Sequence, residues 1–300
     1  MGSKVNWTSL DYPGLLPEGW DRAALLSLTR LLSPVYLGEQ SAMLGANRAI
    51  TVFSAENEMS YVVYLATFMN DEARHLEALT RLYEGAGLEP ASIRELPDML
   101  RYHHRMRGSG NIISWVTGIL VSDIFARHFY RLLSQVYEET PLGEMSTKVI
   151  VDEGRHQAFA VHYLTAALPH LDEDEHRFLW DVKEDLLAIV GRLGVALDED
   201  ARRLGIDGKE LFEGFAEDVD RHCRKVGLTS RCRLCPANGA STPEWSELTG
   251  KGCACDLLAA ESGDVAADGG TAGTPSPVRE GNTASPAGPP SDLRTRGDAS

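Results

Sequence analysis

Apolar residues recur every three or four positions along much of the chain, the spacing that gathers them on one face of an α-helix. We expect a first helix that begins between Asp21 and Ser33, where Pro34 can start or kink it. Three further helices of the central region are expected over Ser54–Gly85, Asn111–Glu139 and Pro141–Leu168. The pattern therefore predicts an all-α protein built around a four-helix bundle.

Composition divides the chain into four parts. A Pro- and Gly-bearing arm comes first, then the helical domain, a Cys-containing segment and a tail too poor in apolar groups to fold, which we expect to be disordered. Their ranges are 1–20, 21–230, 231–261 and 262–300. Within the helical domain, Leu88–Gly110 reads as a long crossover. Asp172–Val226 predicts two or three additional C-terminal helices, broken near Gly205 and Gly208.

One motif occurs twice, as Asp71-Glu72-Ala73-Arg74-His75 and as Asp152-Glu153-Gly154-Arg155-His156. Both copies fall inside expected helices. Because each helical residue turns by about 100°, a Glu and a His three positions apart project from the same face and can bind one metal ion. Each half of the chain thus offers one carboxylate and one imidazole.

Each motif is preceded by an acidic residue on a separate apolar-periodic run. Glu39 lies 33 residues before Glu72, and Asp123 lies 30 residues before Glu153. Di-metal carboxylate bundles use this set of ligands, in which two helices give one acid each and the other two give Glu-x-x-His. One such motif arises easily by chance, whereas two copies with matched upstream acids do not.

Acidic and His residues on amphipathic helices are most often solvated, which is the alternative interpretation for each ligand taken singly. Here the motif residues share their faces with apolar side chains such as Phe68 and Leu79, so burial in a bundle is expected. Two nearby histidines are unsuitable as ligands. His128 lies about 140° round the helix from Asp123, and His162 lies about 240° round from His156.

Residues 31–170 resemble the ferritin-like non-haem di-iron carboxylate superfamily. The Asp and Arg that flank each motif resemble its oxygenase branch, which includes multicomponent monooxygenases and ribonucleotide reductase small subunits. The resemblance implies a ferritin-like bundle in which Glu72 and Glu153 bridge the metals. The six implied ligands are Glu39, Glu72, His75, Asp123, Glu153 and His156.

The same resemblance implies a surrounding set of hydrogen bonds. Asp71 is assigned to His156 and Asp152 to His75, with Arg74 and Arg155 balancing the two carboxylates. A metal-bound imidazole needs its second nitrogen held in this way, because that contact fixes the tautomer and the ring orientation.

Four carboxylates and two imidazoles favour two iron ions, one of which Mn²⁺ can replace, over structural zinc with its preference for thiolates. The sequence departs from the family at Asp123, where Glu is usual. Aspartate is one methylene shorter, so it can reach the metal only if its helix packs closer or if it binds through one oxygen.

The resemblance implies a di-iron oxygenase that uses dioxygen to hydroxylate a carbon or to N-oxygenate an amine of a small organic substrate in a dedicated biosynthetic pathway. Electrons would come from a ferredoxin or a reductase. The alternative is an iron oxidase or peroxide-reducing protein without an organic substrate. Leu79 occupies the place of the reductase radical tyrosine, which disfavours that role. The expected pocket lining is Val35, Met43, Ile119, Ala126 and Arg127, the last as a partner for a substrate carboxylate or in a surface ion pair.

Net charge and the lack of targeting signals limit which binding partners and which cellular location are expected. The net charge of −15 argues against nucleic acid and anionic membranes, because both bind basic surfaces. Met1–Trp7 lacks the apolar core of a signal peptide, and Ile112–Val121 is too short to span a bilayer. We therefore expect a cytoplasmic protein. A homodimer is compatible with the sequence without being required by it.

All five cysteines lie near the C-terminus, where a C-x-x-C is followed by a C-x-C. This spacing fits a zinc site or a rubredoxin-type knuckle poorly. Reduced thiols and a bound thiophilic metal both stay open. The positions are Cys223, Cys232, Cys235, Cys253 and Cys255.

Overall fold

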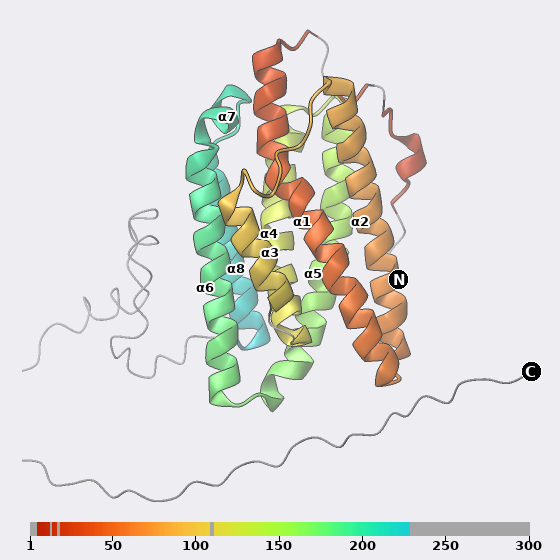
Figure 1. Ribbon diagram of the computed structural model, residues 1–300, viewed down its shortest axis with the longest axis vertical. Helices are drawn as coiled ribbons and strands as arrows, with labels where there is room; N and C mark the ends of the chain where they lie inside the picture. The colour runs from red at the N-terminus through yellow and green to blue at the C-terminus, as the bar shows by residue number, and fades with distance from the viewer. Residues whose placement is uncertain (1–4, 13, 17–18, 109–110, 229–300) are drawn as a thin grey trace, which may run out of the picture.

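A computed structural model of the protein describes residues 5–12, 14–16, 19–108 and 111–228. These residues form an upright bundle of long helices with no strand among them (Figure 1). Helix α1 packs chiefly on α2, and α4 packs chiefly on α5, so the bundle is made of two helix hairpins. The helices are α1 (Arg22–Ala55), α2 (Met59–Ala86), α3 (Pro97–Gly108), α4 (Ile112–Val136), α5 (Pro141–Ala167), α6 (Glu173–Ala196), α7 (Asp198–Arg203) and α8 (Gly208–Val226).

Helix α1 begins directly after its N-cap residue Asp21 and ends later than the sequence predicted. The Asp21 carboxylate accepts a hydrogen bond from the Ala24 N–H, as an N-cap does, and Pro34 lies inside the helix. The second helix was expected from Ser54, but α1 continues to Ala55. Asn57 then takes a left-handed backbone conformation with φ of 62°, so the chain reverses there and α2 begins at Met59.

The expected crossover contains a helix that the sequence analysis missed. Met99, Tyr102 and Met106 of α3 are buried against the bundle, at the spacing of one helical face. The basic residues around them, from Arg101 to Arg107, hid this short apolar periodicity. Helix α3 packs on both α1 and α6, so it covers part of the bundle's side.

The second hairpin lies close to its predicted bounds. Asn111 caps α4, and Thr140 caps α5, where Pro141 takes the first helical position. Helix α4 is long and apolar enough to cross a membrane by length and composition, which the shorter stretch Ile112–Val121 did not suggest. In the structure 61% of the most apolar 18-residue stretch of α4 is buried, because α5, α6 and α8 pack around this helix. Its apolar character therefore matches a central core helix.

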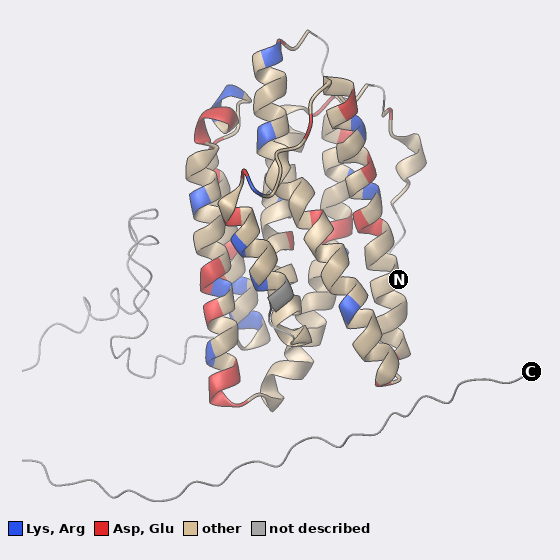
Figure 2. Cartoon of the chain, viewed as in Figure 1, with Lys and Arg blue, Asp and Glu red and all other residues tan. Residues whose placement is uncertain are grey.

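Three further helices follow, in agreement with the sequence. Asp172 and Glu175 form a capping box at the start of α6. Gly205, with φ of 75°, breaks the chain between α7 and α8. Acidic and basic residues follow one another along α6 and along the C-terminal half of α2 (Figure 2).

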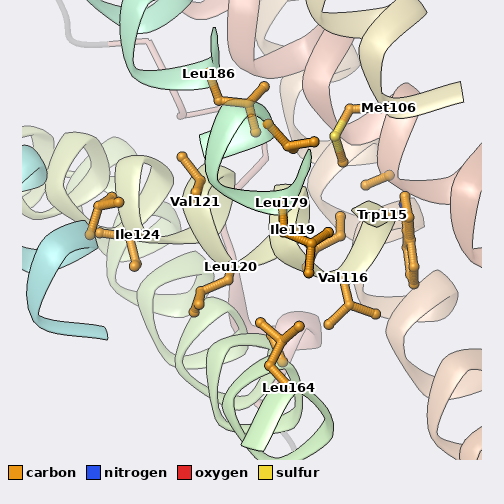
Figure 3. Packing of buried hydrophobic residues seen from close by; sticks show 14 of the residues in the cluster. Met106, Trp115, Val116, Ile119, Leu120, Val121, Ile124, Leu164, Leu179 and Leu186 are labelled. Carbon is orange, nitrogen blue, oxygen red and sulfur yellow. The ribbon is translucent and has the colours of Figure 1, made fainter. Parts of the chain in front are cut away.

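Two apolar clusters hold the bundle together. In one of them Trp115 and Ile119 of α4 meet Met106 of α3, Leu164 of α5 and Leu186 of α6 (Figure 3). The other joins the opposite ends of the bundle helices to the N-terminal arm, whose Trp7, Leu10 and Leu15 are buried. Cys223 is buried on α8. The other four cysteines and the tail 262–300 lie outside the described residues.

Candidate metal centre

The six acidic and histidine residues singled out from the sequence lie together in the interior of the bundle. None of them is more than 6% exposed. Charged side chains are rarely so deeply buried without partners. Each of the four bundle helices contributes: Glu39 from α1, Glu72 and His75 from α2, Asp123 from α4, and Glu153 and His156 from α5.

The carboxylate of Glu72 lies between the two histidines. Its Oε2 is 3.6 Å from Nδ1 of His75, and its Oε1 is 3.2 Å from Nδ1 of His156. One oxygen therefore faces each imidazole. This is the arrangement that a carboxylate needs to bridge two cations.

Glu153 repeats this arrangement from the other hairpin. Its Oε1 is 3.6 Å from Nδ1 of His75, and its Oε2 is 3.1 Å from Nδ1 of His156. The two motif glutamates thus lie between the same pair of imidazoles, as the repeat in the sequence leads one to expect.

The two upstream acids complete two overlapping groups of ligand atoms. Glu39 joins Glu72, His75 and Glu153, while Asp123 joins Glu153 and His156. In each group the ligand atoms lie within 4.8 Å of one another. Asp123 thus reaches the centre despite its shorter side chain, and its buried Oδ2 has no hydrogen-bond partner among the described residues.

The donor set fits a pair of divalent cations. Glu72 Oε2 and His75 Nδ1 are further buried atoms without hydrogen-bond partners, although buried polar atoms nearly always have one. Burial, and then the negative charge of Glu39, raise the pKa of Glu72 well above its usual value. Burial and the charge of Glu153 do the same for the pKa of Asp123. Cations at this position would neutralise the mutual repulsion.

The second nitrogen of each histidine faces an aspartate from the other hairpin. Nε2 of His75 is 3.4 Å from Oδ2 of Asp152, and Nε2 of His156 is 3.7 Å from Oδ2 of Asp71. These are the pairings that the family resemblance implied. Burial alone would raise the pKa of Asp152, but the contacts with His75 and Trp7 outweigh it and lower that pKa. Each aspartate is thus held as a carboxylate that can orient its imidazole.

Arg155 joins the two halves of this outer layer. Its Nη2 donates to Oδ2 of Asp71, at 2.9 Å, and also to Oδ1 of Asp152. Burial lowers the pKa of Arg155, but the bonds to Asp71 and Asp152 outweigh it, so the pKa is raised. Among the described residues, Arg74 has one ion pair, with Nη1 3.6 Å from Oδ1 of Asp71. The arginines of the two motif copies therefore differ in their contacts: Arg155 bonds to two aspartates, and Arg74 approaches one.

One residue of the outer layer was missed by the sequence analysis. The indole N–H of Trp7, in the N-terminal arm, donates to Oδ2 of Asp152 at 3.0 Å. Its ring lies 5.6 Å from the imidazole of His75, centre to centre. A single aromatic residue in an arm without helical periodicity gave no signal of this contact.

A cavity of about 80 Å³ lies beside the carboxylates, bounded by α1, α3, α4 and α6. Val35 and Ala126 line it, as the sequence predicted. The structure corrects three other expected positions, which are not among its lining residues. Arg127 donates to Gln157 at 2.7 Å instead, Ile119 is buried in the apolar cluster of Figure 3, and Met43 is turned about 100° from the lining residue Ala42.

The two histidines rejected as ligands lie elsewhere. His128 contacts the carboxylate of Asp218 on α8, at 2.9 Å, and His162 is exposed on α5. The helical geometry used in the sequence analysis accounts for both positions.

No model of a known protein family matches the chain, and no curated protein matches it. Several solved structures, however, are similar to the chain. An aldehyde deformylating oxidase from Synechococcus superposes with a TM-score of 0.57 at 19% identity, covering 73% of this chain and 94% of that one. A glycine-to-leucine variant of an R2-like ligand-binding oxidase with an Fe/Fe cofactor gives 0.62 at 17% identity, over 75% and 90% of the two chains.

A tyrosine-to-phenylalanine variant of an R2-like ligand-binding oxidase, with a Mn/Fe cofactor, gives a TM-score of 0.58 at 16% identity over 75% of this chain and 90% of that one. Likenesses at such low identity concern the fold. The centre described above lies in the four helices of that shared bundle. The chain therefore has the ferritin-like helical fold of these di-metal oxidases.

Proposed function

We propose that the protein is a di-iron oxygenase that uses dioxygen to oxidise a carbon or an amine nitrogen of a small organic substrate. The observation that carries this proposal is the meeting of four carboxylates and two imidazoles from four helices at one buried point. Glu39, Glu72, His75, Asp123, Glu153 and His156 are the proposed ligands. Glu72 and Glu153 have one oxygen toward each imidazole, which supports them as bridges.

Iron is the metal that the donor set favours. Oxygen donors with two imidazoles suit Fe²⁺ and Mn²⁺, and none of the proposed ligands is a thiolate. The similar oxidases carry Fe/Fe or Mn/Fe cofactors, so one iron can be replaced by manganese in this proposal. Two bound iron ions would supply the electrons that reduce dioxygen.

The residues of the chain would hold and shield this chemistry. Asp71 and Asp152 would orient the two imidazoles, and Arg155 bonds to both aspartates and balances one of their two negative charges. Phe68, only 2% exposed, packs its ring 4.3 Å from that of His156. Such apolar walls exclude water, which would otherwise quench reactive oxygen species.

The cavity favours an organic substrate over the alternative of an iron oxidase. Apolar walls with a few polar groups are typical of small-molecule sites, and this cavity reaches Glu39, Asp123 and Glu153. Hydroxylation consumes one dioxygen, two electrons and two protons, inserts one oxygen atom into the substrate and releases one water. The electrons must come from outside the protein, through a ferredoxin or a reductase.

Metal loading tests the ligand assignment. Anaerobic addition of Fe²⁺ to the wild-type protein should give about two iron ions per chain, measured after desalting. Glu153→Gln should bind fewer, because Glu153 faces both imidazoles. His162→Ala is the matched control, since His162 is an exposed histidine of the same helix, and it should bind the wild-type amount. Equal loading of Glu153→Gln and wild type would contradict the assignment.

Oxygen consumption separates the two functions. A di-iron oxygenase oxidises the two resident ions and then stops unless electrons are supplied, whereas an iron oxidase continues to oxidise added Fe²⁺. We expect dioxygen uptake to level off once about two Fe²⁺ per chain have been oxidised and to resume when a reductant is added. Uptake that grows in proportion to excess Fe²⁺ would favour the iron oxidase.

A further inference from the structure

The cavity beside the candidate metal centre has two neutral polar side chains among its lining residues, Tyr102 of α3 and Ser122 of α4. The remaining lining consists of apolar residues, Gly38 and the four acidic residues of the centre. No Lys, Arg or His is among the lining residues that the structure describes. A ligand in this cavity therefore meets hydroxyl groups and hydrocarbon.

Both hydroxyl groups line the cavity. Ser122 Oγ donates to the carbonyl oxygen of Gly118 at 2.9 Å, so its lone pairs stay available to accept a hydrogen bond. The phenol oxygen of Tyr102 also has lone pairs that can accept from a ligand. Tyr102 is only 7% exposed, so that acceptor is sheltered from bulk water.

Charge balance disfavours an ionic ligand in the cavity. Two divalent cations would neutralise the four carboxylates of the centre, which leaves no net charge at the inner end of the cavity. The nearby cation Arg127 is bound to Gln157 and lies outside the lining. In the outer part of the cavity, a carboxylate or an ammonium group would thus lose its hydration without gaining a partner of opposite charge.

We propose that the cavity selects a neutral, largely apolar molecule with a hydroxyl group, and that the Tyr102–Ser122 pair binds this hydroxyl. The hydrocarbon part would lie against Leu186, Ile189 and Leu193 of α6, which form an apolar wall. The proposal that this molecule is a substrate rests on the proposed oxygenase function. Its binding in the cavity can be measured without turnover.

Binding of matched six-carbon probes tests the charge selection. Hexan-1-ol, hexanoate and hexylammonium would be titrated calorimetrically into full-length protein loaded with Mn²⁺ in the absence of dioxygen. We expect hexan-1-ol to bind at least ten times more tightly than either ion. Equal or tighter binding of hexanoate or hexylammonium would overturn the proposal.

Substitution of the phenol tests the hydroxyl contact. Loss of one net hydrogen bond should weaken the binding of hexan-1-ol to Tyr102→Phe by about 2- to 12-fold. Binding of 1-chlorohexane, which cannot donate a hydrogen bond, should stay the same. Tyr36→Phe is the control, because Tyr36 bonds to Thr80 outside the cavity and should leave both affinities unchanged.

Ser122→Ala provides a second variant if Tyr102→Phe does not fold, and it should show the same loss for the alcohol alone. Equal weakening for alcohol and chloride, or no weakening in either variant, would overturn the role of the pair. The oxygenase proposal fails separately, through the metal loading and the dioxygen uptake described above. If hexan-1-ol binds as expected but the protein shows no oxygenase activity, the proposed ligand class is supported and the oxygenase function is not.

Discussion

The indole N–H of Trp7 and the carboxylate of Asp152 are joined by a buried hydrogen bond of 3.0 Å across 145 residues of sequence. Asp152 in turn contacts Nε2 of His75, so the N-terminal arm is connected to a proposed metal ligand through a single side chain. The arm therefore belongs to the support of the centre as well as to the apolar core.

Replacing Trp7 by Phe should keep most of the packing and remove this hydrogen bond. The Asp152 oxygen would lose its buried donor, which costs about 1–3 kcal/mol. We expect lower stability in urea unfolding and weaker metal binding in a competition titration with a chelator. Trp20→Phe is the control, because Trp20 packs on Tyr137 away from the centre. Unchanged metal affinity in Trp7→Phe would show that the arm does not influence the ligand.

The two motif arginines should differ in importance. Arg155 bonds to Asp71 and Asp152, whereas Arg74 approaches only Asp71 and only to 3.6 Å. Arg155→Leu leaves two aspartates without their shared cation, so metal affinity should fall by about 10- to 100-fold, the usual range for groups that support metal ligands. Arg74→Leu should lose much less. Chelator competition on both variants measures the difference, and equal losses would contradict it.

The repeated hairpin and the meeting of its six polar residues could be foreseen because both depend on local spacing. Glu72 and His75 share a helix face by geometry alone, and the second copy of the motif implied a second such face. The Asp71 and Asp152 pairings came from the family resemblance.

What escaped prediction depends on contacts between distant segments. Trp7 reaches Asp152 only because the arm folds back on the bundle, and no periodic pattern marks that contact. Helix α3 was hidden because its basic residues interrupt a short apolar face. Arg127 was expected to bind a substrate carboxylate or to form a surface ion pair, but its Nη1 donates to Gln157 on the adjacent helix. Pocket linings therefore depend on tertiary packing as well as on helix phase.

Lys183 of α6 should give a measurable dependence of stability on pH. Only 3% of its side chain is exposed, and Nζ contacts Asp220 at 2.6 Å and Glu184 at 2.9 Å. Burial lowers the pKa of Lys183, but these two charges outweigh it, so its pKa is raised above 10.5. A group with a raised pKa stabilises the fold below its unfolded pKa and loses this contribution as the pH rises through its folded pKa.

Lys183→Met should therefore be less stable than wild type by about 1–2 kcal/mol at pH 8, and this gap should shrink above pH 10.5. Urea unfolding at pH 8, 9.5 and 11 measures it. The exposed Lys209 is the control, because Lys209→Met should show no such gap at any of these values. A gap for Lys183→Met that persists unchanged to pH 11 would mean that packing, not charge, causes it.

Gly38 should control how much space the cavity offers. It lines the cavity one residue before Glu39, and a Cβ added there would meet no atom within 4 Å. Gly38→Leu should therefore fold without strain and gain up to about 1 kcal/mol in helix propensity. Its side chain would occupy the cavity, so hexan-1-ol should bind at least ten times more weakly while the metal content stays at the wild-type level.

Gly194→Leu is the matched control, because Gly194 is an exposed glycine of α6 that also has free space around its Cα and does not line the cavity. It should gain similar stability and bind hexan-1-ol as wild type does. Calorimetry and metal analysis of the two variants distinguish filling of the cavity from a general effect of a longer side chain on a helix. If Gly38→Leu retained full affinity for the alcohol, the probe would have to bind elsewhere, and the cavity would lose its assigned role.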